Sequence, residues 1–408
     1  MSKRENIVVG LDIGTTKICV IVAEVTADGI DIVGMGLCPS KGLRKGVIVN
    51  IDGTVKAIKE AVKEAELMSG IKIESVFTGI AGGHISGFNS NGVIAVKGKE
   101  ITEQDITRVI DAATAVSLPA DREVLHVIPQ EFIVDGQDGI KDPLGMSGVR
   151  LEAKVHIVTG AVASAQNIVR ACNKAGLNVQ DIIIEQFASS EAILNKDEKE
   201  LGVAVVDIGG GTTDIAVFYE SSIAYTGIIS IGGDQVTNDI AIGLRTPLES
   251  AEAIKKEFGC CYSEFVDDDE YIEVPGIGGR KPKSMQRNIL VEIIEPRVEE
   301  LFSLIKREVA RSGVYESLAS GIVLTGGTVI MDGMVELAEE IFELPIRRGC
   351  PKKVGGLFDV VNSPMYATAV GLVLYGSKNI KRDEFPKRNK MPFDNVLKRM
   401  TEWFKEFF

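Results

Sequence analysis

Runs of apolar, mostly β-branched residues alternate along the chain with short polar turns and longer amphipathic stretches. The first apolar pattern covers residues 7–22 and is interrupted by Asp12-Ile13-Gly14-Thr15-Thr16-Lys17, the composition of a tight turn. It predicts two strands joined as a hairpin. The pattern returns at residues 203–217, where Asp207-Ile208 precedes Gly209-Gly210-Gly211-Thr212-Thr213. This repetition predicts a duplicated domain.

The segments between and after the hairpins carry helical and mixed patterns. Residues 51–70 and 161–175 each place apolar side chains at helical spacing and end at a glycine, so both predict helices. The apolar run 182–184 predicts a strand. Residues 85–157 have the pattern of an inserted module of short strands and turns, with one helix near 103–116.

Together these patterns predict an α/β fold of two duplicated α/β domains around a cleft. The first domain is expected to contain residues 1–84, 158–193 and 365–378, with the small α+β subdomain 85–157 inserted in it. The second is expected to contain 194–246 and 318–364, with a helix-rich subdomain at 247–317. Residues 379–394 predict a flexible linker, and 395–408 predict a C-terminal amphipathic helix.

The composition is that of a globular protein with more than one domain. The chain of 408 residues is longer than domains with a single hydrophobic core usually are. Hydrophobic residues make up 45% of it, as is usual for a globular protein. No uncharged apolar run reaches the roughly 18 residues of a membrane-spanning helix. The six cysteines show no CxxC spacing, which favours reduced structural thiols. The net charge of −13 argues against nucleic acid as the main partner.

The C-terminal end differs in charge from the rest of the chain. Residues 376–408 contain nine basic and five acidic residues, so the remaining body is more acidic than the whole. Residues 395–408 carry one apolar stripe at helical spacing. A helix that docks on the protein's own core has the same pattern, but the basic linker before it favours an anchor in an anionic membrane surface. The stripe consists of Val396, Leu397, Met400, Trp403, Phe404 and Phe407.

The two glycine- and threonine-rich turns have the composition of phosphate-binding loops. Glycine lets backbone N–H groups approach a phosphate, and threonine adds hydroxyl donors beside them. Asp12 and Asp207, at equivalent strand ends, would lie near the phosphates and therefore imply Mg²⁺. One such turn is also compatible with an ordinary hairpin, whereas two copies favour a clamp on one triphosphate.

A third glycine turn, Leu324-Thr325-Gly326-Gly327-Thr328, follows an apolar strand and precedes a helix expected near Asp332. It is compatible with a simple strand–turn–helix joint, or with a glycine backbone lying against a purine and its ribose. The chain has neither a GxxxxGK[ST] loop nor a GxGxxG turn opening a helix. This argues against a Walker-type ATPase and against a dinucleotide-dependent oxidoreductase.

The three turns resemble the phosphate-1, phosphate-2 and adenosine motifs of the actin, heat-shock chaperone and sugar-kinase superfamily. Within it, the chain is similar to the FtsA family of actin-like cell-division proteins over essentially its whole length. The closer similarity rests on four segments, at residues 126–130 (HVIPQ), 134–137 (VDGQ), 139–146 (GIKDPLGM) and 293–302 (IIEPRVEELF).

The resemblance implies an ATP site in the cleft, where Asp12 and Asp207 would hold hydrated Mg²⁺ and take part in catalysis. The helix 251–258 would grip the ribose and adenine with three residues of one face, unless that face is simply solvated. The residues expected to bind the nucleotide are Gly14, Thr15, Thr16, Lys17, Gly209, Gly210, Gly211, Thr212, Thr213, Glu252, Lys255, Lys256, Gly326, Gly327 and Thr328.

One position departs from the pattern of polymerising relatives, which carry Gln or Glu on the helix before an Ala-Gly turn to orient the attacking water. Counting back from Ala175-Gly176 places that position at Arg170, which cannot accept a proton from water. Gln166, one turn earlier, is a possible substitute, and Glu185 and Gln186 are further polar candidates. We therefore expect at most a slow ATPase.

The resemblance implies a nucleotide-dependent structural adaptor. Such a protein would polymerise into actin-like filaments, tether FtsZ filaments to the cytoplasmic face of the membrane at the division septum, and recruit later division proteins. Arg287, Asn288 and Arg297 are candidate FtsZ contacts on the helix-rich subdomain. Two alternatives stay open, a sugar or small-molecule kinase of the same superfamily and an actin-like pilus-assembly ATPase.

Overall fold

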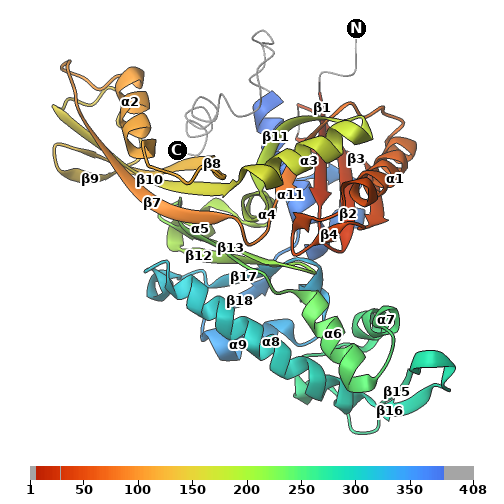
Figure 1. Cartoon of the computed structure of the whole chain (residues 1–408). Helices are drawn as coiled ribbons and strands as arrows, with labels where there is room; N and C mark the ends of the chain where they lie inside the picture. Colours follow the sequence, from red (N-terminus) through yellow and green to blue (C-terminus); the bar gives the residue numbers. More distant parts are fainter. Residues whose placement is uncertain (1–5, 28, 381–408) are drawn as a thin grey trace.

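Figure 1 shows two lobes, one above the other, with a smaller subdomain that projects from the upper lobe. The computed structural model describes residues 6–27 and 29–380. The predicted membrane helix, residues 395–408, lies outside the described residues. Within 6–27 and 29–380, no helix combines the length and the apolar composition that crossing a membrane requires.

A six-stranded sheet of order β11-β6-β1-β2-β3-β19 forms the centre of the upper lobe. The hairpin predicted at residues 7–22 is confirmed, because β1 pairs antiparallel with β2 while β6 lies parallel to β1 on its other side. Its central strands are apolar along their length, as expected for strands covered on both faces. The strands are Ile7–Ile13 (β1), Lys17–Val25 (β2), Ile30–Pro39 (β3), Ser75–Ile80 (β6), Asn178–Ile184 (β11) and Gly355–Gly356 (β19), and a small separate hairpin is Leu43–Arg44 (β4) and Val47–Ile48 (β5).

Helices cover both faces of this sheet, with α1 and α3 on one side and α4 and α11 on the other (Figure 1). The two helices predicted from periodicity are confirmed. Their ends are at Gly70 and Gly176, which adopt the left-handed conformation at φ of 69° and 95°. The four helices are Ile51–Ser69 (α1), Val162–Ala175 (α3), Glu185–Ile193 (α4) and Ala367–Ile380 (α11).

The lower lobe repeats this arrangement around a five-stranded sheet of order β14-β13-β12-β17-β18. The hairpin predicted at residues 203–217 is confirmed, and β17 lies parallel to β12 as β6 does to β1. The repeat in the sequence is therefore a repeat in the structure. The strands are Val203–Ile208 (β12), Thr213–Tyr219 (β13), Ser222–Ile229 (β14), Ile322–Thr325 (β17) and Ile346–Arg348 (β18).

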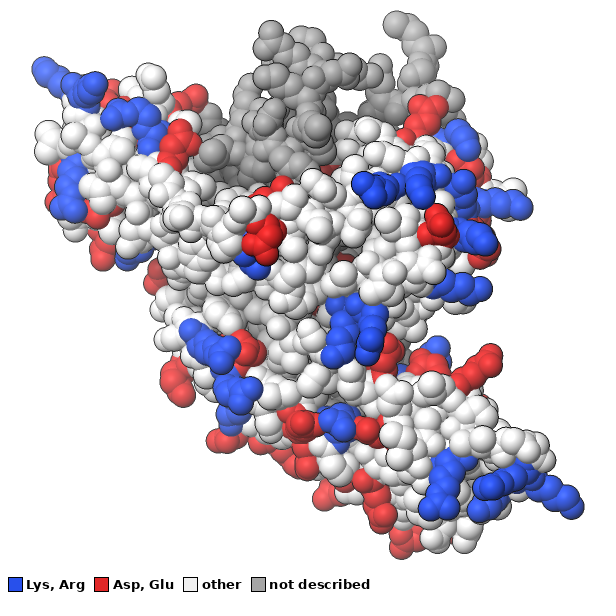
Figure 2. Space-filling model, in the orientation of Figure 1, with Lys and Arg blue, Asp and Glu red and all other residues white. Residues whose placement is uncertain are grey.

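The far end of the lower lobe is helical, as predicted, but it also contains a hairpin that the sequence analysis missed. β15 and β16 pair antiparallel. Ile272 and Val274 are buried and alternate with exposed residues, which is the strand pattern that could have indicated this hairpin. Figure 2 shows basic side chains gathered at this tip. The remaining elements are Lys196–Leu201 (α5), Gly233–Leu244 (α6), Leu248–Phe258 (α7), Tyr271–Val274 (β15), Lys283–Gln286 (β16), Arg287–Ala310 (α8), Met334–Phe342 (α9) and Phe358–Val361 (α10).

The projecting subdomain is a four-stranded sheet of order β7-β10-β8-β9 with helix α2 across one face (Figure 1). The expectation of short strands is wrong, because β8 and β10 have 13 and 12 residues. β8 continues through Pro129 because its pairing with β10 shifts register there. The elements are Ser86–Ala95 (β7), Glu103–Thr114 (α2), Arg122–Val134 (β8), Gln137–Ile140 (β9) and Arg150–Ala161 (β10).

The projecting subdomain also contacts the lower lobe. Gln130 Nε2 donates to the Ile223 carbonyl oxygen at 2.7 Å, and His156 Nε2 lies 2.8 Å from Thr226 Oγ1. Burial lowers the pKa of His156 to about 4, so the imidazole is neutral at physiological pH. The subdomain is therefore attached to both lobes.

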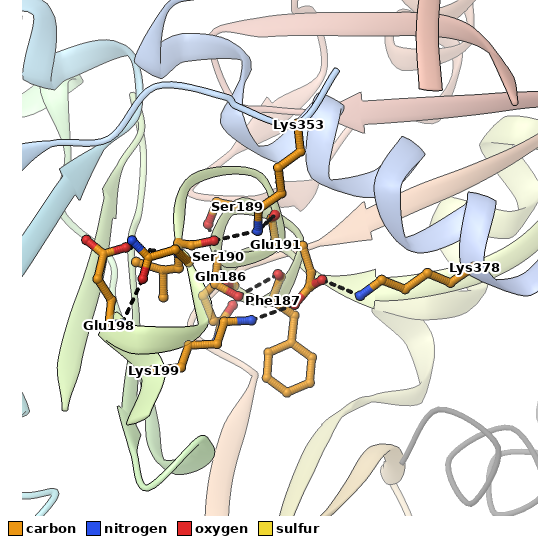
Figure 3. Close-up of polar contacts among 11 residues, drawn as sticks. Gln186, Phe187, Ser189, Ser190, Glu191, Glu198, Lys199, Lys353 and Lys378 are labelled. Carbon is orange, nitrogen blue, oxygen red and sulfur yellow. Dashed lines mark hydrogen bonds and ion pairs between the residues drawn. The ribbon is translucent and has the colours of Figure 1, made fainter. Parts of the chain in front are cut away.

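A buried ion-pair cluster lies at the junction of the lobes (Figure 3). Glu191 of α4 accepts from Lys199 of α5 at 2.7 Å and from Lys378 of α11 at 2.6 Å. Burial alone would raise the pKa of Glu191, but the two lysines outweigh it and lower the pKa to about 2. The predicted start of the linker at residue 379 is wrong, since α11 runs to Ile380 and its last turn is held by this ion pair and by the buried Ser377.

Replacing Glu191 with alanine removes the carboxylate that Lys199 and Lys378 share. We expect the free energy of unfolding to fall by about 3–5 kcal/mol, because an ammonium then stays buried without that counter-charge. Urea denaturation of the Glu191→Ala chain measures the loss. Glu249→Ala, an exposed glutamate of α7, is the control and should stay within about 0.5 kcal/mol of the original chain. Equal losses of unfolding free energy in both variants would show that the ion pairs of Glu191 do not stabilise the fold more than an exposed glutamate does.

Candidate functional site

The two predicted phosphate turns have the same local geometry. In each, the N–H of the first glycine donates to the carbonyl oxygen three residues later, Gly14 to Lys17 at 3.0 Å and Gly209 to Thr212 at 2.9 Å. The residues between them form the tip of the turn. Thr213 is used differently from the prediction, because its hydroxyl donates to the Ile231 carbonyl oxygen.

The two turns meet tip to tip between the lobes. A Cβ atom at Gly210 would lie 1.8 Å from Thr16 Oγ1, and one at Gly211 would lie 2.7 Å from Thr15 Oγ1. Any side chain at either glycine would push the lobes apart. The structure therefore brings N–H groups and hydroxyls from both halves of the chain to one small region, where they can serve as donors to a phosphate.

Four carboxylates lie beside the turns. Asp12 and Asp207 end equivalent strands and are only 5% and 8% exposed, and Asp214 stands opposite Asp207 on the neighbouring strand. Glu185, the first residue of α4, packs against Gly79 of β6, where a Cβ would lie 2.9 Å from its Cγ. The turn motifs predicted Asp12 and Asp207 as site residues. Asp214 follows the second turn and was not predicted.

Some of this negative charge is compensated. Lys17 Nζ lies 2.9 Å from Asp12 Oδ2, so the lysine predicted to bind phosphate has a carboxylate partner in this structure. Burial alone would lower the pKa of Lys17, but Asp12 raises it above its ordinary value. Thr368 Oγ1 donates to Asp207 Oδ2 at 3.0 Å. Asp214 Oδ1 is buried without a hydrogen-bond partner in the described part of the chain.

The pKa values of Asp207, Asp214 and Glu185 are raised. Burial is the main cause for Asp207, whose pKa rises to about 6, and burial followed by neighbouring carboxylates raises the pKa of Asp214 and of Glu185. A dication with its bound waters would reduce this repulsion and supply a partner for Asp214 Oδ1, so these residues fit Mg²⁺. The described residues contain no group of three or more ligating side chains that could hold the ion directly.

The structure changes the assignment of the water-orienting position. Gln166 and Arg170 are both exposed on α3, and neither lies among the carboxylates. Glu185 does, since the charges of Asp12, Asp214 and Asp207 act on it. Glu185, one of the further polar candidates from the sequence, therefore lies nearer to the carboxylates than Gln166 or Arg170 does. Glu185, at the start of the next helix, faces the turns.

The third glycine turn borders the lower-lobe phosphate turn. Thr328 Oγ1 donates to the Gly209 carbonyl oxygen at 2.9 Å. Gly326 has φ of 95°, and a Cβ there would lie 2.5 Å from Asp207 Oδ1. The close approach of Asp207 is therefore enough to require glycine at this position. The helix expected near Asp332 begins at Met334.

Glu252, Lys255 and Lys256 were predicted to share one face of α7, and part of that face lies beside these turns. Lys255 and Lys256 both contact Glu252, at 2.6 Å and 3.2 Å, which confirms that the three share one face. Lys255 also donates to the Gly233 carbonyl oxygen at 3.0 Å, and Gly233 contacts Thr328. Lys256 is largely solvated, but Lys255 lies beside the third glycine turn.

The predicted partner contacts already have acidic partners within the lower lobe. The predicted membrane residues 396–407 lie outside the described residues. The intramolecular contacts are Arg287 with Glu270 at 2.7 Å, Asn288 with Asp268 at 2.7 Å and Arg297 with Asp239 at 2.5 Å.

Comparison with known proteins settles the family. The model of the family "Cell division protein FtsA" matches residues 204–371, and "SHS2 domain inserted in FTSA" matches residues 82–159, which contain the projecting subdomain. The Cell division protein FtsA of Pseudomonas aeruginosa is 54% identical over 98% of both chains. The chain belongs to the FtsA family of cell-division proteins. This membership sets aside the sugar-kinase and pilus-assembly alternatives.

The solved structures confirm the actin-like fold of this FtsA-family chain. A chain of the PilM-PilN type IV pilus biogenesis complex matches with a TM-score of 0.64 and 16% identity, covering 91% of this chain and 98% of that chain. MreB 5 of Spiroplasma citri bound to AMPPNP matches with a TM-score of 0.57 and 14% identity, covering 93% and 98%. Identities this low show a shared fold alone.

The raised carboxylate pKa values predict how the stability of this FtsA-family protein depends on pH. The folded chain binds protons on Asp207, Asp214 and Glu185 more tightly than the unfolded chain. Their contribution to the free energy of unfolding is therefore present at low pH. It is lost as the pH rises, through about 6 for Asp207 and through about 8 for Asp214. Urea denaturation in a chelator at pH 5.5 and pH 8 should show this loss.

Asp214→Asn serves as the matched comparison for the pH measurement. It removes one of the coupled acids at nearly unchanged side-chain volume, so the difference in unfolding free energy between the two pH values should shrink. A pH dependence identical to that of the original chain would contradict the assignment of the loss to this cluster.

Proposed function

We propose that this FtsA-family protein binds ATP and Mg²⁺ between its two lobes. One observation supports the proposal above all others, the tip-to-tip meeting of two equivalent glycine–threonine turns beside a cluster of carboxylates. In the proposed complex, Thr15, Thr16 and the backbone of residues 209–212 donate hydrogen bonds to the phosphates. The fold neighbour MreB 5 holds AMPPNP, which is compatible with a nucleotide in this cleft.

Mg²⁺, when bound, would neutralise part of the phosphate charge. Asp12 and Asp207 would hold its water shell, and Asp214 would contribute its buried oxygen atom to the same shell. The third glycine turn and the α7 face would hold the adenosine, because Thr328 and Lys255 both lie at the Gly209 end of the phosphate turn.

Glu185 is the group we propose for orienting the attacking water. It is partly accessible to solvent, whereas the three aspartates of the cluster are buried. Burial and the neighbouring carboxylates raise its pKa, and a bound cation would oppose that rise.

Glu185→Gln should lower the ATP turnover number about 100-fold, the usual effect of removing a general base. The affinity for Mg·ATP should stay within about twofold, because glutamine keeps the side-chain shape. Phosphate release and calorimetric titration measure the two quantities. Gln166→Ala should leave both unchanged, and the addition of sugars should not raise the turnover number. A larger loss of ATP turnover in Gln166→Ala than in Glu185→Gln would contradict the proposed role of Glu185.

The second part of the proposal concerns assembly at the division septum. Copies with bound nucleotide would form actin-like filaments that tether FtsZ filaments to the cytoplasmic face of the membrane and recruit later division proteins. Membership of the FtsA family supports this role. Residues 395–408 would supply the anchor. One short helix binds a membrane reversibly, but several on one filament bind firmly because each later contact is intramolecular.

The exposed cations at the tip of the lower lobe are better partner candidates than the residues predicted from sequence. Arg287, Asn288 and Arg297 already contact acidic residues of the lower lobe. Arg280, Lys281 and Lys283 are exposed around the β15–β16 turn, where Figure 2 shows basic side chains together. An acidic segment of FtsZ would fit this tip.

Deleting residues 395–408 should abolish sedimentation of the protein with anionic liposomes. Trp403→Glu places a charge in the apolar stripe and should weaken sedimentation nearly as much. Asn395→Glu adds the same charge away from the stripe and should have little effect. Unchanged sedimentation of the deletion variant would contradict the anchor.

A further inference from the structure

The β4–β5 hairpin lies where the two phosphate turns meet. Its turn consists of Lys45 and Gly46. The Gly46 N–H donates to Thr15 Oγ1 at 2.9 Å, and a Cβ at Gly211 would lie 3.0 Å from the Lys45 Cα. The Lys45-Gly46 turn therefore touches the phosphate turn of the upper lobe and that of the lower lobe at once.

The backbone at this turn is held in an unusual conformation. Lys45 has φ of 49°, in the left-handed region that residues with a Cβ seldom adopt. The segment around Gly82 packs behind it, since a Cβ at Gly82 would lie 3.3 Å from the Lys45 carbonyl oxygen. The side chain of Lys45 is exposed. Gly46 has φ of 75°, so both turn residues have the positive φ that a two-residue hairpin turn commonly requires.

The order of contacts along the lower-lobe turn identifies which phosphate would lie beside Lys45. Thr328, on the proposed adenosine side, contacts Gly209. Lys45 and Thr15 contact Gly211, at the other end of the turn. A nucleotide with its adenosine beside Thr328 extends its phosphates from Gly209 towards Gly211, so its last phosphate ends next to Lys45.

We propose that Lys45 binds the terminal phosphate of ATP and thereby distinguishes ATP from ADP. The inference rests on the nucleotide site proposed above and adds a specificity-determining residue to it. The flexible four-carbon stem of lysine carries a compact ammonium, which binds phosphate as a point charge. From a Cα in contact with Gly211, this ammonium can reach a phosphate bound beside Thr15 and Gly211. ADP has no third phosphate and leaves the contact unmade.

The test compares ADP with AMPPNP, which is not hydrolysed, by calorimetric titration of the full chain with Mg²⁺. Lys45→Asn removes the charge, and asparagine tolerates the left-handed backbone, so the turn is kept. The affinity for AMPPNP should fall about tenfold, the value of one charge-assisted hydrogen bond, while the affinity for ADP stays within about twofold. Lys45→Arg should restore most of the affinity for AMPPNP.

Lys41→Asn is the matched control, because Lys41 is exposed on the segment that leads into the same hairpin. It should change neither affinity. Equal weakening of both nucleotides by Lys45→Asn, or no weakening of AMPPNP, would overturn the role of Lys45 while leaving the nucleotide site intact. If the original chain binds neither nucleotide, the proposed function fails, and this inference fails with it.

Discussion

The contact between the two glycine–threonine turns determines how the rest of this FtsA-family structure is arranged. Each turn lies at the end of a hairpin in a buried sheet, so neither tip can shift without moving the lobe behind it. Gly210 and Gly211 permit the approach because they lack side chains. In the proposed complex, a phosphate bound by both tips would therefore act on both lobes.

The carboxylates beside this contact make the site sensitive to cations. Four acids in a largely buried region repel one another, and the structure relieves this repulsion with one lysine and a threonine hydroxyl. The rest of the charge is neutralised either by protons or by a bound cation. In the proposed complex, binding of Mg²⁺ would therefore release protons from this cluster.

Helix α11 connects this cluster to the junction of the lobes. Thr368 in its first turn donates to Asp207, and Lys378 in its last turn contacts Glu191. The chain then continues into the residues proposed to carry the membrane anchor. One helix thus joins the proposed nucleotide site to the end of the described residues, and it packs on β1, β2 and β6 of the upper-lobe sheet.

The sequence by itself determined the duplicated hairpins, the helices ended by Gly70 and Gly176, and the turns that supply donors for phosphate. These features depend on residues close together in the chain, so the local sequence pattern is sufficient to predict them. The tertiary structure decided which acids share the site, because Asp12, Glu185 and Asp207 come from three separate segments. It also placed Glu185, rather than Gln166, among these acids and brought Lys45 to the glycine–threonine turns. Such contacts depend on how sheets and helices pack, and no spacing along the chain records that packing.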